Sequence, residues 1–107
     1  MAKTQGVQVY EILPDGCLNG TYANDDTGNK IYNEIARKRT GDTTDIIGLY
    51  DCFYFDLGNT NQPCELEIKL GSTSQYEFIW RTADKEIFKG QGWKANQHQV
   101  MLKYQSV

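Results

Sequence analysis

Apolar and polar residues alternate along most of this chain in short runs that are rich in Tyr, Phe, Ile and Val, and Gly, Asn, Asp, Ser and Thr cluster between the runs. Alternation with a period of two is typical of strands with one buried face, and the polar clusters are typical of hairpin turns. The pattern predicts about eight strands: Val7 to Leu13, Cys17 to Asn24, Lys30 to Arg39, Ile46 to Asp56, Cys64 to Leu70, Gln75 to Thr82, Glu86 to Trp93 and Gln99 to Gln105. The segment from Ile31 to Lys38 also contains helix-forming residues, so a helix there stays an alternative.

The first turn predicts how its flanking strands pair. Residues 14–16 (Pro-Asp-Gly) suit a three-residue hairpin loop, with Pro at the first turn position and Gly in the left-handed conformation. This loop pairs Leu13 with Cys17, and it therefore sets Tyr10 opposite Gly20. An aromatic ring would then cover a residue that has no side chain of its own.

The second half of the chain gives a set of pairings in which apolar residues share one face. Leu66, Ile68 and Leu70 alternate with charged residues, which identifies the core side of that strand. Matching the apolar faces across the first hairpin pairs Leu70 with Tyr76, Ile68 with Phe78 and Leu66 with Trp80. Across the next hairpin, with its turn at residues 83–85, it pairs Trp80 with Phe88, Phe78 with Gly90 and Tyr76 with Gly92. Val100, Leu102 and Tyr104 then fall on the same inner face.

The fold predicted from these faces is an all-β, single-domain antiparallel meander over residues 1–107. Such a meander buries its apolar face either by closing into an up-and-down barrel or by folding into two packed sheets. The inner glycines at 20, 90 and 92 favour the barrel, because they relieve crowding where a small sheet coils tightly. A chain of 107 residues leaves room for one such domain.

The fourth strand is apolar on both faces. One face carries Ile46, Tyr50, Cys52 and Tyr54, and the other carries Ile47, Leu49, Phe53 and Phe55. An outward apolar stripe is typical of a partner surface. We therefore expect a homodimer more than a monomer.

Charge and hydropathy argue against several partners. The chain has 11 Lys and Arg against 14 Asp and Glu, and this net charge of −3 offers no electrostatic footprint for nucleic acid or an anionic membrane. The one basic run, residues 37–39 (Arg-Lys-Arg), is typical of a solvated strand end. No apolar run is long enough for a membrane helix or a signal peptide. The start at Met1 favours a cytoplasmic protein, and a secreted or periplasmic location stays open if a leader has been removed.

Few residues suggest metal or catalytic chemistry. Cys17, Cys52 and Cys64 are odd in number and contain no C-x-x-C pair, which argues against zinc and against a disulfide scaffold. Cys52 and Cys64 are expected to be cross-strand neighbours, either bridged or free and buried. The single histidine, His98, lies at a turn without a nucleophile motif. The acidic turn at residues 25–29 lacks the ligand spacing of a calcium loop.

We therefore expect no cofactor, no metal and no enzymatic activity. An enzyme stays an alternative, because carboxyl groups and tyrosines from distant strands can converge without a linear motif.

The inner face is rich in aromatic residues: Tyr22, Tyr76, Phe78, Trp80, Phe88 and Tyr104. These rings either fill the barrel as core or line a pocket, since the interior of an eight-stranded barrel is wide enough for side chains or for one small ligand. Tyr and Trp also carry polar tips that need a partner when they are buried.

Three segments resemble a known family. Residues 18–25 (Leu-Asn-Gly-Thr-Tyr-Ala-Asn-Asp) resemble the opening strand of avidin and streptavidin, with its Gly-x-aromatic-x-Asn pattern, although here a whole strand precedes it. Residues 78–80 and 88–93 are similar to that family's later Trp-bearing strand and its aromatic-x-Gly-Gln-aromatic segment. The broader calycin group, with the lipocalins, shares the Gly-x-Trp feature. The resemblance implies an up-and-down barrel with a ligand at its open end, and Asn24 matches the family's ligand-binding Asn.

These observations lead to two functional hypotheses. The first is a non-enzymatic barrel that binds a small, mostly apolar molecule through Tyr22, Asn24, Tyr76, Trp80 and Tyr104. The alternative is an interaction or structural module that acts through the outward stripe of Ile47, Leu49, Phe53 and Phe55.

Overall fold

The computed structural model describes residues 3–28, 30–40, 45–55, 61–71 and 74–107. It contains the strands β1 (Gln5–Ile12), β2 (Leu18–Asn24), β3 (Tyr32–Thr40), β4 (Gly48–Phe55), β5 (Asn61–Leu70), β6 (Tyr76–Thr82), β7 (Lys85–Lys94) and β8 (Gln99–Ser106). The helical alternative for residues 31–38 is wrong, because this segment forms β3 and pairs with strands on both sides. In the described ranges no helix could cross a membrane.

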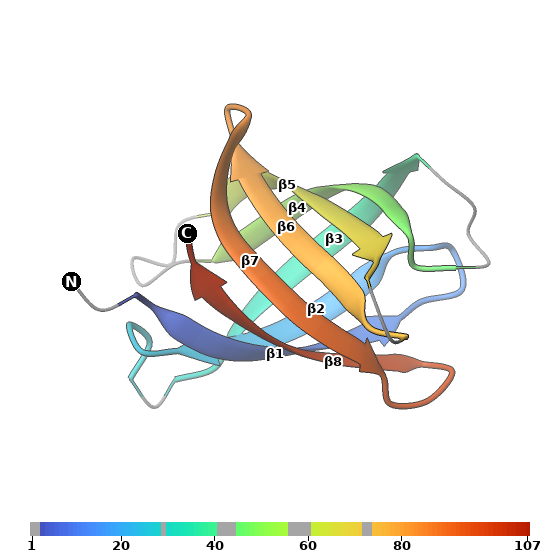
Figure 1. Cartoon of the computed structure of the whole chain (residues 1–107), viewed down its shortest axis with the longest axis horizontal. Helices are drawn as coiled ribbons and strands as arrows, with labels where there is room; N and C mark the ends of the chain where they lie inside the picture. The colour runs from blue at the N-terminus through green and yellow to red at the C-terminus, as the bar shows by residue number, and fades with distance from the viewer. Residues whose placement is uncertain (1–2, 29, 41–44, 56–60, 72–73) are drawn as a thin grey trace.

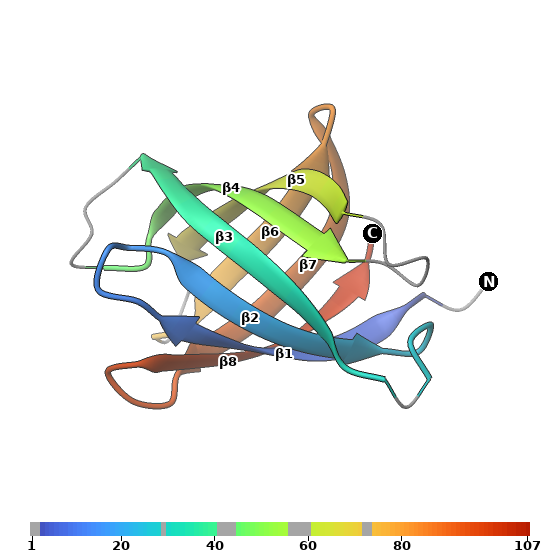
Figure 2. The ribbon, with the colours of Figure 1, turned by 180° about the vertical axis from the view of Figure 1, so that it is seen from behind.

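The strands form one closed up-and-down barrel, as the alternation predicts. Each strand pairs antiparallel with the next, and β1 returns to pair with β8. In Figure 1 the strands β6 to β8 face the viewer. In Figure 2, which is seen from behind, β2 to β5 face the viewer. Both chain ends and the β2–β3 turn lie at the same end of the barrel (Figure 1). Closure leaves no sheet edge with unpaired backbone groups.

The predicted registers are confirmed. Tyr10 opposes Gly20, and the Leu13 amide donates to the Cys17 carbonyl oxygen at 2.9 Å, next to Gly16 with a φ of 87°. The pairings of β5 with β6 and of β6 with β7 also hold. One detail differs: the β6–β7 turn spans residues 83–84, both with positive φ, and Lys85 already belongs to β7. A bulge after Trp80 takes up the extra residue and restores the register.

The inner glycines lie where neighbouring chains pack closely. A Cβ atom added at Gly20 would lie 2.8 Å from Cε1 of Tyr10, so the ring covers this glycine as expected. At Gly90 and Gly92 the nearest atoms belong instead to β8, the strand hydrogen-bonded on the other side. The β7 and β8 chains therefore lie close together at these two glycines.

The two faces of β4 are arranged as the sequence predicts. Ile46, Tyr50 and Cys52 are buried and Tyr54 is half-buried, whereas Ile47 is 37% exposed, Phe53 is 44% exposed and Leu49 is half-buried. The side chain of Phe55 lies outside the described residues. Ile35 of β3 opposes Phe53 and is also exposed, so the apolar stripe continues onto the next strand. Cys52 and Cys64 are opposite each other in β4 and β5, and both are free thiols.

The last residue of the basic run takes part in ion pairs on the outside of the barrel. Arg39 lies 2.7 Å from Asp51 and 3.0 Å from Glu65, and Arg81 of β6 lies 2.8 Å from Glu67 and 3.3 Å from Glu65. Because these pairs are partly exposed, each contributes at most about 1 kcal/mol. Their main effect is to keep the outer face of β5 polar.

Candidate ligand site at one end of the barrel

The barrel interior is packed at one end and hollow at the other. Large apolar side chains that are at most 2% exposed fill the packed end: Leu18, Ile46, Tyr50, Ile68 and Val100. At the end that carries the β2–β3 turn, the interior holds a cavity of about 360 Å³. This volume is within the range of about 300–1,000 Å³ that is usual for small-molecule sites. The interior is therefore neither wholly filled nor wholly empty.

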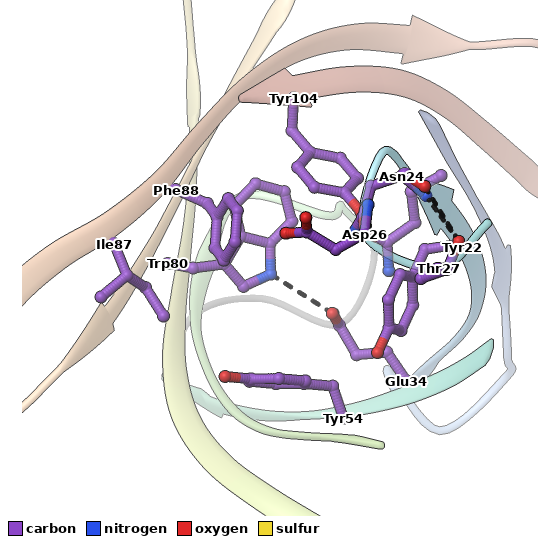
Figure 3. Close-up of a pocket in the computed structure, with 11 residues that line it drawn as sticks. Tyr22, Asn24, Asp26, Thr27, Glu34, Tyr54, Trp80, Ile87, Phe88 and Tyr104 are labelled. Carbon is purple, nitrogen blue, oxygen red and sulfur yellow. Dashed lines mark hydrogen bonds between the residues drawn. The ribbon is translucent and has the colours of Figure 1, made fainter. Parts of the chain in front are cut away.

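Five of the eleven residues that line the cavity are aromatic. Tyr22, Tyr54, Trp80, Phe88 and Tyr104 line it, and Figure 3 shows their side chains converging on a common space from strands far apart in the sequence. The Trp80 and Tyr104 ring centroids are 5.6 Å apart, and those of Phe88 and Tyr104 are 5.5 Å apart. Tyr22 and Tyr54 meet edge to face at 6.5 Å. These contacts fix the rings around the space and leave the space itself open.

The β2–β3 turn shapes the mouth of the cavity. The Asn24 side-chain oxygen accepts a hydrogen bond from the Asp26 amide at 2.8 Å, and Thr27 Oγ1 accepts one from the Asn24 amide at 3.0 Å. Residues 25–28 form a turn, and Gly28 adopts the left-handed conformation in it with a φ of 64°. Asn29 lies outside the described residues. This network places Asp26 and Thr27 on the cavity lining.

Asn24 also connects the turn to the wall. Its amide nitrogen donates to the hydroxyl of Tyr104 at 3.0 Å. Burial raises the pKa of Tyr104 to about 12, and the nearby carboxyl groups of Glu34, Asp25 and Asp26 act in the same direction. The Tyr104 hydroxyl therefore keeps its proton at neutral pH and can donate a hydrogen bond.

A buried carboxyl group forms the floor of the cavity. Glu34 is 4% exposed and accepts hydrogen bonds from the Tyr10 hydroxyl and, at 3.4 Å, from Trp80 Nε1 (Figure 3 shows the second bond). Burial raises the pKa of Glu34, while its hydrogen-bond donors, led by Tyr10, partly oppose that rise. Burial, followed by the charge of Glu34, raises the pKa of Tyr10 well above its ordinary value.

Gln8 of β1 adds a second buried polar group. Its side chain is 3% exposed and lines the cavity, and Nε2 has no hydrogen-bond partner within the described residues. The amide is close enough to Glu34 to lower the pKa of that carboxyl without completing a hydrogen bond. Because an unsatisfied buried donor is destabilising, any acceptor that reaches Nε2, a water molecule included, would stabilise this position.

The structure brings together four of the five residues proposed from the sequence. Tyr22, Asn24, Trp80 and Tyr104 line the cavity. Tyr76 lies apart from it, because its register with Leu70 and Gly92 places it toward the packed end.

Glu34, Gln8 and Tyr54 also line the cavity, and the hypothesis from the sequence does not include them as site residues. Glu34 belongs to the segment for which a helix was the alternative. The neighbouring Ile35 is apolar and is 47% exposed. The register of β3 against β2 is the signal that could have placed Glu34 on the inner face, because it sets Glu34 opposite the inward Gly20.

The one histidine of the chain does not line the cavity. His98 is exposed in the turn between β7 and β8, at the opposite end of the barrel from the β2–β3 turn. Among the residues that the structure describes, no three His, Cys, Asp or Glu side chains are grouped to hold a metal ion. The cavity can enclose an apolar molecule, and it offers Glu34, Gln8 and Asn24 as polar anchors.

Replacing Glu34 with glutamine should change how stability depends on pH. Because folding raises the pKa of Glu34 above its ordinary value of 4.5, the folded state favours the protonated carboxyl, and its stabilising contribution is lost as the pH rises through the folded pKa. Glutamine does not titrate. We therefore expect the free energy of unfolding of Glu34→Gln, measured by urea denaturation, to rise relative to wild type between pH 4 and pH 7.

The matched control is Glu11→Gln, which removes a carboxyl from the exposed outer side of β1 and corrects for the loss of one negative charge. Parallel pH curves for wild type and Glu34→Gln would contradict the expected effect.

Comparisons with known proteins give no family. No family model matches this chain, and no curated protein and no solved structure shows significant similarity to it. The closed eight-stranded barrel is compatible with a calycin-like fold at the level of architecture.

Proposed function

We propose that this protein is a non-enzymatic binding protein that encloses a small, mostly apolar molecule in the open end of its barrel. The observation that carries the proposal is the cavity of about 360 Å³ behind the β2–β3 turn, walled by five aromatic side chains. Burying apolar ligand surface contributes roughly 25 cal/mol per Å², and the rings supply that surface. Asn24, Gln8 and Glu34 would orient the molecule.

The resemblance of residues 18–25 to the avidin and streptavidin strand supports the same proposal at a finer level. Asn24, the position that matches the family's ligand-binding Asn, lies at the cavity mouth and contacts Tyr104. In this chain the matching segment is the second strand, with β1 inserted between it and β8. A calycin-like binding role therefore rests on the cavity and this one position.

Fluorescence of Trp80 tests the proposal. The chain has two tryptophans, and Trp93 is 53% exposed on the outside, so Trp93→Phe leaves Trp80 in the cavity wall as the reporter. Nitrobenzene, a small apolar quencher, should quench this variant saturably, because it occupies a finite site. In the matched variant Trp80→Phe, quenching of Trp93 should rise linearly with concentration. Linear quenching in both variants, with no molecule retained in native mass spectrometry, would argue against the proposed function.

A second candidate function is association through the apolar stripe on β4. Ile47 and Phe53 are more than a third exposed, and Ile35 of β3 extends the stripe. Self-association would bury these side chains. Sedimentation equilibrium should then show a dimer in the wild type and a monomer in Phe53→Glu, and a wild type that is monomeric at all concentrations would remove this candidate.

A further inference from the structure

The ionisable side chains that line the cavity include two carboxyl groups and no cationic group. Asp26 lies at the mouth and Glu34 at the floor, and no Lys, Arg or His side chain lines the space among the residues described. Asp26 is exposed and Glu34 is 4% exposed, so the two acids mark the entrance and the deepest point. Burial is the main cause of the raised pKa of Tyr104, and the charges of Glu34, Asp25 and Asp26 add to it, so the negative groups also act on the wall.

The aromatic wall, like the carboxyl groups, favours a positive charge. The face of a Trp, Tyr or Phe ring carries partial negative charge and attracts a cation within about 6 Å of its centroid. Five such rings surround this cavity, and neighbouring centroids lie 5.5–6.5 Å apart. At these spacings a cation inside the cavity can lie close to several rings at once.

We propose that the ligand of this cavity is a small organic ammonium ion, with its nitrogen held between Glu34 and the aromatic rings and its apolar part packed against the wall. This inference rests on the proposed binding function and narrows it from a mostly apolar molecule to one that carries a positive charge. Asp26 at the mouth would attract the cation before Glu34 pairs with it.

The energetics of Glu34 favour a cation over a neutral molecule or an anion. A buried carboxylate without a counter-charge is costly, and the groups that reach Glu34, among them Tyr10 and Trp80, are neutral hydrogen-bond donors. A neutral apolar ligand would displace solvent and leave that cost in place, and an anion would add repulsion. A cation compensates the charge in a site where solvent screening is weak.

The size of the cavity sets the scale of a suitable probe. A volume of about 360 Å³ equals roughly a dozen waters at ~30 Å³ each. Benzyltrimethylammonium is of this order and joins a ring to a quaternary ammonium group. Its neutral isostere, 2,2-dimethylpropylbenzene, replaces the nitrogen with carbon, and phenylacetate supplies an anion of similar size.

Binding is measured by titration of the Trp93→Phe variant, with Trp80 fluorescence as the signal. We expect benzyltrimethylammonium to bind at least about tenfold more tightly than the neutral isostere, and phenylacetate to give no saturable signal. Equal affinity of the cation and its isostere would overturn the inference and leave the proposed function intact. No saturable signal from any of the three probes would contradict both.

Variants of the two acidic residues show which carboxyl group is responsible for the preference for a cation. Glu34→Gln should lower the affinity for benzyltrimethylammonium relative to that for the neutral isostere at least about tenfold, and circular dichroism shows separately whether the variant is folded. Asp26→Asn should have a smaller effect in the same direction, because this residue is exposed. Glu11→Gln, on the outer side of β1, is the matched control and should bind both probes as the wild type does.

Either of two results would show that Glu34 does not hold the cation. One is an unchanged cation affinity in Glu34→Gln. The other applies if Glu34→Gln does not fold. In that case the deciding result is an unchanged affinity of Asp26→Asn for benzyltrimethylammonium, together with equal binding of this cation and its isostere by the wild type.

Discussion

Replacing Gly92 with valine is expected to remove a large share of the stability of this protein. A Cβ atom at this position would overlap the Met101 carbonyl oxygen and lie 2.5 Å from Cβ of Leu102, so the β7 and β8 backbones would have to separate. Valine favours strands by at most about 1 kcal/mol. Overpacking against a backbone that cannot yield costs about 3 kcal/mol or more, and the total stability of a domain is about 5–15 kcal/mol.

The measurement is urea denaturation followed by circular dichroism, with Gly28→Asn as the matched control. Gly28 has no atom within 4 Å of its added Cβ, and Asn tolerates its φ of 64°. The control should therefore lose less than about 1 kcal/mol. A Gly92→Val variant that unfolds near the wild-type midpoint would mean that β7 and β8 are not packed this closely.

Truncating Phe78 to alanine is expected to cost about 3–5 kcal/mol. The side chain is fully buried between Tyr10 and Trp80, with ring centroids 6.4 Å and 6.1 Å away. It lies where the packed core meets the hollow end, and its removal would extend the empty space toward the core. The loss is read from the shift in the denaturation midpoint at constant slope.

Phe53→Ala is the matched control for this prediction. It deletes the same atoms from a side chain that is 44% exposed on the outer face of β4. The expected loss is within about 0.5 kcal/mol, because exposed apolar side chains contribute little to the core. Similar losses in both variants would indicate that the outer stripe is covered, as in the dimer considered above.

The hollow end lowers the stability of the folded barrel, and the packed end can offset that loss. Glu34 and Gln8 place polar groups where an apolar core would be more stable, and the cavity gives up packing contacts that close-packed side chains would make. Such departures from core packing are typical of functional sites. The polar floor and the empty volume occur at the same end of the barrel, and for this reason we propose a ligand site there.

Much of the fold was predictable from the sequence, because strands and turns are encoded locally. The period-two alternation identified eight strands, and the segment 14–16 with its left-handed Gly set the first register. Inner glycines at 20, 90 and 92 indicated closure into a barrel. In each case a short stretch of chain carried the whole signal, so no distant contact was needed to interpret it.

The site itself depended on tertiary structure. Glu34 is charged and Ile35 is apolar, yet the barrel buries the first and exposes the second, and donors from β1 and β6 reach the buried carboxyl. Whether rings fill or line an interior depends on side-chain volumes summed over all eight strands. The sequence alone thus determined an eight-stranded barrel with an aromatic interior, and only the closed structure decided that one end is hollow, with a carboxyl group at its floor.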